Sequence, residues 1–261
     1  MKKIFGFALF MVIGYNSYSQ KGFHVGGFLG MNSVWIVNQN AWNITSQSVP
    51  NLATPSDEQP ELEYRAAFGG MYGIAMGYNF TDNIGFQTEF LFSHQGQKYE
   101  GYYYGTNFIE KEVRLHYFQI PILFKFTSNS PNARFFVMAG PQFGFLTQAH
   151  STINWDGMPH AFVDPYTGES LEYDNLDVMH RYQPSDIGFH LNVGTDIPLT
   201  DNLYLSAGLK LYWGFPDIND EDWRLVKLSA PYDYVKSTAA YGGLNVGFHY
   251  VIGEGYTNRR Y

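Results

Sequence analysis

The chain has 261 residues, of which 45% are hydrophobic and 18% aromatic, and its formal net charge is −8 at pH 7. It contains no cysteine, which excludes both disulfides and a lipid-modified cysteine anchor. An acidic chain gains nothing from a phosphate backbone, so no nucleic acid is expected as a partner. No later segment offers the roughly 18 to 20 uninterrupted apolar residues of a membrane-spanning helix.

Residues 1–19 have the layout of a secretory signal peptide. Lys2 and Lys3 form a basic start, Ile4 to Ile13 form an apolar stretch, and Ser17 and Ser19 place small residues at the −3 and −1 positions of a cleavage site. The apolar stretch is too short to span a bilayer as a helix. We therefore expect export and cleavage after Ser19.

The rest of the chain alternates between apolar and small or polar residues with a period of two, which is typical of β-strands. The clearest case is an apolar parity with polar residues and glycines between its members: Ile187, Phe189, Leu191, Val193 and Ile197. The same pattern predicts eight strands, near residues 23–32, 68–80, 84–95, 114–127, 134–148, 186–197, 203–213 and 243–250.

The connections between these strands alternate in length. Short polar turns are expected at 81–83, 127–133 and 198–202, and long polar loops near 37–65, 96–112, 149–184 and 215–237. Short periplasmic turns and long extracellular loops are typical of outer-membrane barrels. The sequence predicts an all-β, antiparallel, up-and-down transmembrane barrel of about eight strands over 20–252, with a short periplasmic tail at 253–261. A soluble β-sandwich is the structural alternative.

The chain resembles the PorT-like, porin-family outer-membrane β-barrel domain. The resemblance rests on Tyr117, Ile120 and Pro121 in one strand and on Ala139-Gly140-Pro141 in the next. Further agreement comes from these residues: Gly30, Asn32, Gln87, Thr88, Glu89, Asp186 and Gly188. The resemblance covers roughly 21–252 and implies a small closed barrel in the outer membrane of a Gram-negative bacterium. It names no activity, and some relatives serve secretion or assembly machinery.

The interior of an eight-stranded barrel is just wide enough to be filled by side chains. Seven titratable residues fall on inward parities and are expected to form a paired polar plug, because buried charges require opposite partners: Glu89, Lys125, Asp186, His190, Asp196, Lys210 and His249. A proton or ion path and a hydrolytic site are the alternatives. A metal site at His24, His249 and Asp196 is conceivable, but ordinary hydrogen-bonded histidines are expected, with no metal and no cofactor.

Aromatic residues fall into two groups. One group lies near strand ends, where amphipathic rings favour the membrane interface: Tyr78, Phe80, Phe86, Trp213, Phe248 and Tyr250. The other lies in the predicted loops and could bind partners or pack the loops together: Trp42, Tyr103, Trp155, Tyr166, Trp223 and Tyr234. The loop at 149–184 is rich in carboxylates and histidines, but it has no calcium-loop spacing and is expected to be a solvated acidic loop.

No catalytic constellation is present in these patterns. The leading hypothesis is a non-enzymatic outer-membrane barrel that acts as an accessory or structural subunit of an envelope complex. Its expected partners are outer-membrane lipid and lipopolysaccharide and other envelope proteins, which would bind through the loops or the barrel wall. The alternatives are a narrow channel for small solutes and an outer-membrane hydrolase.

Overall fold

The computed structural model describes residues 21–37, 61–103, 107–130, 132–159, 161–163, 170–172, 174–221 and 236–252. Eight long strands form the body of the molecule: β1 (Gly22–Val37), β3 (Ala67–Asn79), β4 (Ile84–Tyr103), β5 (Asn107–Thr127), β6 (Arg134–Trp155), β11 (Ser185–Pro198), β12 (Leu203–Gly214) and β13 (Thr238–Ile252). The shorter elements are β2 (Glu61–Arg65), β7 (Met158–Pro159), β8 (Ala161–Val163), β9 (Ser170–Glu172), β10 (Leu176–Asp177) and the 3₁₀ turn η3 (Met179–Arg181).

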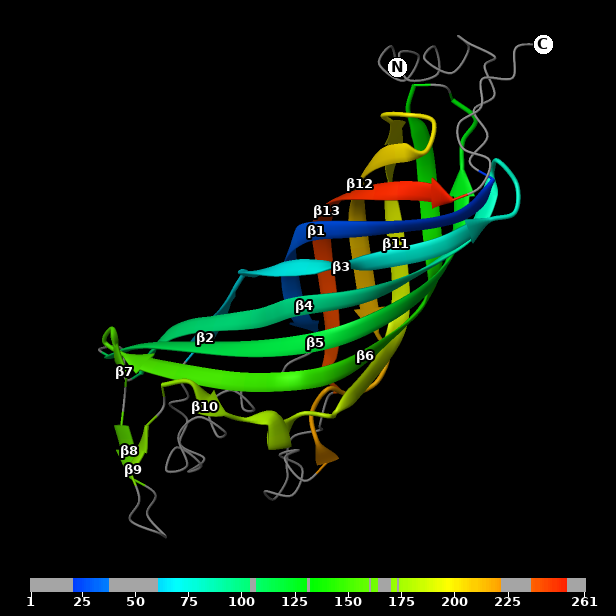
Figure 1. Cartoon of the computed structure of the whole chain (residues 1–261). Helices are drawn as coiled ribbons and strands as arrows, with labels where there is room; N and C mark the ends of the chain where they lie inside the picture. Colours follow the sequence, from blue (N-terminus) through cyan, green and yellow to red (C-terminus); the bar gives the residue numbers. More distant parts are fainter. Residues whose placement is uncertain are drawn as a thin grey trace, which may run out of the picture.

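The eight long strands close into an antiparallel barrel. Each pairs with the next long strand along the chain, and β13 pairs with β1, where Val25 lies opposite Tyr250. In Figure 1 the first and last strands accordingly lie side by side, in blue and red. This is the up-and-down barrel that the alternating pattern predicts, and closure leaves no open sheet edge in its wall.

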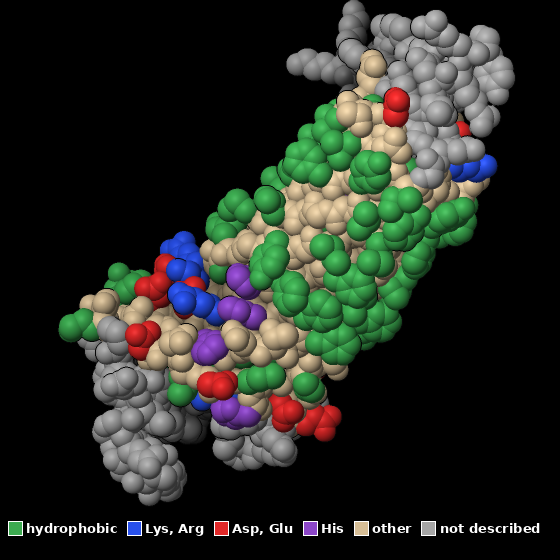
Figure 2. Space-filling model, viewed as in Figure 1, with side chains coloured by type: hydrophobic (Ala, Val, Ile, Leu, Met, Phe, Trp, Pro, Cys, Tyr) green, Lys and Arg blue, Asp and Glu red, His purple; other side chains and the backbone are tan. Residues whose placement is uncertain are grey.

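The apolar parity of each barrel strand faces outward. The exposed apolar side chains form a belt on the barrel wall, and Figure 2 shows one face of this belt in green. All six predicted interface aromatics are exposed on this outer surface, at 37–56% of their area: Tyr78, Phe80, Phe86, Trp213, Phe248 and Tyr250. An outward apolar face of this kind matches a lipid environment rather than a soluble core. In the described residues, no helix is long and apolar enough to cross a membrane.

Tight turns join the strands at the end of the barrel where β1 begins and β13 ends. The Thr81 hydroxyl accepts a hydrogen bond from the backbone of Ile84 at 3.0 Å. The buried Arg134 donates from Nε to the carbonyl of Ser128 at 3.2 Å and from its terminal nitrogen to the carbonyl of Asp82. One guanidinium thus ties two neighbouring turns together, and it satisfies carbonyls that strand pairing leaves free.

Three strands are much longer than predicted. β4, β5 and β6 have 20, 21 and 22 residues, whereas roughly 9 to 11 suffice to cross a bilayer. Three segments that were expected in loops instead continue the sheet: 96–103, 107–112 and 149–155. The predicted loop 37–65 also contains a strand, β2, which pairs with β4. Figure 1 shows this extension, here called the outer sheet, projecting beyond the other strands; it comprises β2 and residues 94–103, 107–116 and 148–155.

A β-bulge marks the base of the outer sheet. The register between β5 and β6 shifts at His116/Tyr117, opposite Leu146 and Gln148, which leaves Thr147 as the extra residue. The Thr147 hydroxyl donates to the carbonyl of His116 at 2.9 Å. Before the bulge, on the side of the tight turns, the buried residues of β6 are even-numbered. After the bulge, in the outer sheet, they are odd-numbered. The bulge therefore exchanges which parity of β6 faces outward.

Several predicted features lie outside the described residues. They include the signal peptide at 1–19, the tail 253–261, and four of the loop aromatics: Trp42, Tyr166, Trp223 and Tyr234.

Candidate functional site

The centre of the lumen holds two ion pairs. Lys125 of β5 donates to Asp196 of β11 with 2.7 Å between Nζ and Oδ2, and Lys210 of β12 donates to Glu89 of β4. All four side chains are almost completely buried. Lys210 Nζ also lies 4.0 Å from the ring centre of Phe28, a cation–π contact. Two buried cations are thus matched by two buried anions, as burial of charge requires.

Two amide side chains contact the lumen histidines, and one of them also contacts an ion pair. Gln87 donates to Glu89 Oε1 at 2.9 Å, and its own oxygen lies 3.2 Å from His24 Nε2. On the other wall, Gln142 Oε1 accepts a hydrogen bond from the Tyr241 hydroxyl at 3.0 Å and lies 2.6 Å from His190 Nδ1. A network of this kind fixes the positions of side chains that come from strands that are not neighbours in the sheet.

Asp186 and His249, the remaining inward residues of the predicted plug, each contact a tyrosine. Asp186 accepts a hydrogen bond from the Tyr212 hydroxyl at 2.6 Å. His249 stacks on Tyr204 with ring centres 4.8 Å apart, and the His24 ring centre lies 6.0 Å from that of His249. All seven predicted residues therefore lie inside the barrel, and four of them form the two ion pairs. Their role as a plug stays a prediction.

An apolar cluster lies over this polar layer at the end of the barrel nearest the outer sheet. Segments that follow β10 and β12 contribute to it, together with the upper ends of barrel strands. Its buried members are Val34, Ile36, Val113, Leu115, Tyr117, Leu146, Ala149, Val178, Tyr182, Tyr212, Ile218, Ala239 and Tyr241. Within the described residues, the barrel interior therefore contains the ion pairs and their amide neighbours, with this apolar cluster nearer the outer sheet.

The conceivable metal site in the lumen is not formed. Among the residues that the structure describes, no three His, Asp or Glu side chains are grouped so that they could hold a metal ion. His24 and His249 do adjoin, as predicted, because β1 and β13 pair on closure. Their contacts with Gln87 and Tyr204 are those of ordinary packed histidines.

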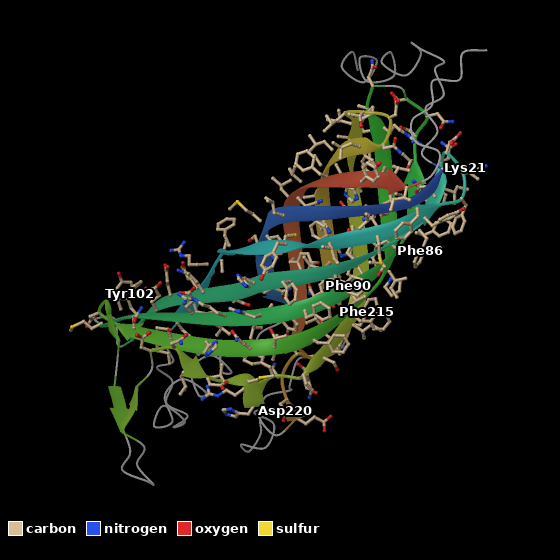
Figure 3. All side chains as sticks on the ribbon, viewed as in Figure 1. Lys21, Phe86, Phe90, Tyr102, Phe215 and Asp220 are labelled. Atoms are coloured by element: carbon tan, nitrogen blue, oxygen red, sulfur yellow. The ribbon has the colours of Figure 1, made fainter. Side chains whose placement is uncertain are left out.

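A pocket of about 510 Å³ lies at the barrel rim between β6, β11 and the segment after β12. Figure 3 labels Phe215 and Asp220, which belong to this segment. The lining combines carboxylates with aromatic residues: Phe143, Gly144, Phe145, Gln183, Ser185, Asp186, Ile187, Pro216, Asp217 and Glu221. Among the described residues that line the pocket, there is no histidine or lysine to activate Ser185 as a nucleophile.

The outer sheet carries a second polar arrangement, on its outward face. Arg114 donates from Nε and from one terminal nitrogen to the two carboxylate oxygens of Glu112, at 3.0 and 3.1 Å. Lys98 lies 3.8 Å from Glu110 and 3.7 Å from Glu112. Arg65 of β2 reaches Glu100 at 2.9 Å. Ion pairs thus join neighbouring strands above the apolar belt, where Figure 2 shows blue and red side chains together.

The inward face of the outer sheet buries one lysine. Lys111 is 4% exposed, and burial, followed by the charge of Arg181, lowers the pKa of its ammonium group to about 7. This residue lies seven positions above Phe118, the uppermost residue of β5 that belongs to the apolar belt, and therefore outside the membrane-spanning part of the strand.

The predicted loop-binding aromatics are only partly placed. Tyr103 and Trp155 lie at the ends of β4 and β6 rather than in loops. The exposed Tyr102 packs instead against Phe108 of β5, with ring centres 5.4 Å apart, and Figure 3 shows Tyr102 at the tip of the outer sheet. Sequence reasoning missed this pair, since it placed both residues in a loop. It also missed Gln87 and Gln142, whose only signal was their inward parity.

The family of the chain is shown by comparison with known proteins. The family described as "Outer membrane protein beta-barrel domain" matches residues 16–220. A search of curated proteins finds no match. Among solved structures, Neisserial surface protein A is 12% identical with a TM-score of 0.41, over 89% of this chain and 98% of that one.

Two further solved structures are similar at the same level. The attachment invasion locus protein Ail of Yersinia pestis, in complex with the heparin analogue sucrose octasulfate, is 11% identical with a TM-score of 0.38, over 88% of this chain and 99% of that one. The N-terminal barrel domain of OprF from Pseudomonas aeruginosa is 11% identical with a TM-score of 0.33, over 88% and 98%. The extent of the family match establishes that this chain belongs to the outer-membrane β-barrel domain family.

Proposed function

We propose that this chain is a non-enzymatic outer-membrane barrel that acts as an accessory or structural subunit of an envelope complex, exported by way of a cleaved signal peptide. The outer sheet serves as its main docking surface for partner proteins. The finer likeness to PorT-like proteins, which rests on Tyr117, Ile120, Pro121 and the Ala139-Gly140-Pro141 element, agrees with such a role. Outer-membrane lipid and lipopolysaccharide surround the apolar wall.

The observation that carries the proposal is the length of β4, β5 and β6 beyond the apolar belt. A chain that only needed to cross the membrane would end these strands near Phe92, Phe118 and Phe145. Here the sheet continues with cross-strand ion pairs and an aromatic pair at its tip. A rigid platform of this kind loses little conformational entropy on binding, unlike a long loop.

The lumen supports the same proposal over the channel alternative. Its two ion pairs and the apolar cluster above them occupy the interior of a barrel whose strand number leaves little space. A water-filled path would have to separate Lys125 from Asp196 or displace the cluster. The first change would leave two buried charges without partners, and the second would expose apolar side chains to water.

The test is affinity purification of the tagged chain from gently solubilised outer membranes, with mass spectrometry of the proteins that accompany it. The test variant is Tyr102→Ser with Phe108→Ser, which removes the aromatic tip. The control variant is Leu199→Ser, which removes an apolar side chain that is 49% exposed at the opposite end of the barrel. We expect a stoichiometric partner with the wild type and the control, and its loss with the tip variant. A lone barrel from wild-type membranes would contradict the proposal.

A further inference from the structure

A row of histidines crosses the outward face of the barrel at the top of the apolar belt. On β4 the outward residue after Phe92 is His94, and on β5 the one beyond Phe118 is His116. The bulge in β6 turns His150 outward at a similar height. Figure 2 shows histidine side chains, in purple, gathered between the green belt and the charged outer sheet.

Two of these histidines form a direct cross-strand pair. His94 and His116 are opposite each other in the register of β4 and β5. Their rings are stacked with centres 4.4 Å apart and an angle of 29° between the planes. His94 also contacts Tyr72 of β3 edge to face, with ring centres 6.3 Å apart. His150 is farther away, with its ring centre 6.5 Å from that of His116.

The charges around the pair favour a cation over an anion. The nearest outward cations, Arg114 and Lys98, are both engaged by Glu112, and Lys98 also lies near Glu110. On the other side, Asp177 of β10 is opposite His150 in the register. A phosphate group would meet no unpaired arginine or lysine among these residues. Imidazole itself is largely neutral above its ordinary pKa of about 6.5, and in this form it is a metal ligand.

We propose that His94 and His116 form a chelating site for a divalent transition-metal ion of the zinc, copper or nickel class. In tetrahedral zinc coordination, with bonds of about 2.0–2.1 Å, two ligand nitrogens lie roughly 3.4 Å apart. The rings of His94 and His116 are stacked with centres 4.4 Å apart, so both must rotate until one nitrogen of each points at the same ion. The paired strands hold both backbones in place while the side chains turn. Water fills the other coordination positions, which face outward at the level of the lipid headgroups.

The experiment is isothermal titration of zinc chloride into the refolded full-length mature chain in phosphocholine nanodiscs at pH 7.5. The test variants are His94→Gln and His116→Gln. The matched control is His180→Gln, which removes an exposed histidine on η3, outside the row. We expect one zinc ion to bind the wild type and the control, and either test variant to weaken that binding by roughly tenfold or more.

Two results would overturn the proposal. One is zinc binding that is unchanged in both test variants, which would place the metal elsewhere. The other is the absence of saturable zinc binding together with saturable binding of inorganic phosphate at pH 5.5 that depends on His94 and His116, which would assign the pair to anions. The gel mobility of the folded barrel, compared with and without heating, confirms that each variant has folded before it is titrated. This site is independent of the proposed docking function.

Discussion

Lys125 and Asp196 meet beneath β6, with 2.7 Å between Nζ and Oδ2, although their strands, β5 and β11, pair with β6 and not with each other. The contact therefore crosses the lumen side of an intervening strand. It holds together three strands of the wall in addition to their backbone hydrogen bonds. Because neither group is exposed, each offsets part of the cost of burying the other.

Removing one member of this pair should destabilise the barrel more than removing both. Lys125→Met or Asp196→Leu leaves a buried charge without its partner, at a cost of about 3–5 kcal/mol. The double variant should recover much of this loss, because no unpaired charge remains. Urea unfolding in lipid vesicles measures all three against the wild type. Equal losses that simply add in the double variant would contradict the pairing.

Two adjacent glycines of β3 should differ sharply in their tolerance of alanine. A Cβ on Gly69 would overlap the backbone oxygen of His94, whereas a Cβ on Gly70 would have no atom within 4 Å. Gly69→Ala must displace backbone and should lower the free energy of unfolding by about 1–3 kcal/mol. Gly70→Ala is the matched control and should be nearly neutral. The same urea experiment measures both, and similar losses would show that the β3–β4 approach is looser than described.

The buried Lys111 should make stability increase with pH. Its folded-state pKa of about 7 lies below the ordinary lysine value of 10.5. Below pH 7 the ammonium group is charged in both states, and its burial opposes folding. Above pH 7 the folded form loses the proton while the unfolded form keeps it, so the penalty declines until the unfolded lysine also deprotonates. We expect the free energy of unfolding to rise between pH 7 and about 9.5.

Lys111→Met should remove this dependence and raise stability most at the lower end of the range. Lys98→Met is the control: it changes a lysine on the outward face of the same sheet, whose exposed ion pairs contribute about 0–1 kcal/mol. Unfolding in uncharged vesicles at several pH values measures both variants. Burial raises the pKa of Tyr182 to about 12, so its ionisation opposes the trend only above about pH 10. A pH profile unaffected by Lys111→Met would contradict the assignment.

The filled lumen predicts electrical silence. Purified, refolded barrel inserted into planar bilayers should give no discrete conductance steps at neutral pH, because ion pairs and the apolar cluster block the axis. Breaking one pair alone should not open a path while the cluster remains. Discrete steps from the wild-type chain would favour the channel alternative over a structural subunit. A larger barrel of known conductance serves as the positive control.

The periodicity of the sequence predicted the eight-stranded barrel correctly, but it did not predict the outer sheet. Within the belt one parity must be apolar, so strands such as β11 are visible in the sequence. Beyond the belt both faces of β4 are polar: Gln95 and Gln97 point inward, while His94 and Lys98 point outward. With no apolar parity left, the pattern resembles a loop. These segments are strands because neighbouring strands pair with them.

The inward parity was equally readable, but the pairing of charges was not. Glu89 and Lys210 are 121 residues apart, and only the register and stagger of the closed barrel bring them together. Hydrogen-bond partners such as Gln142 and Tyr241 depend on the same geometry. Sequence alone could therefore supply the members of the lumen set but not their partners.

The bulge at Thr147 determines which side chains in the upper part of β6 face the interior. Downstream of it, Ala149, Ser151 and Ile153 face the interior, and His150 faces out, only because one extra residue has been accommodated. Deleting Thr147 would restore strict alternation across β6. Ala149, Ser151 and Ile153 would still face the interior, because Leu146 and Gln148 would then be consecutive, as their partners Tyr117 and His116 already are. The upper part of β6 therefore keeps its faces when Thr147 is bulged out or absent, whereas a Thr147 that took a regular place in the ladder would reverse them.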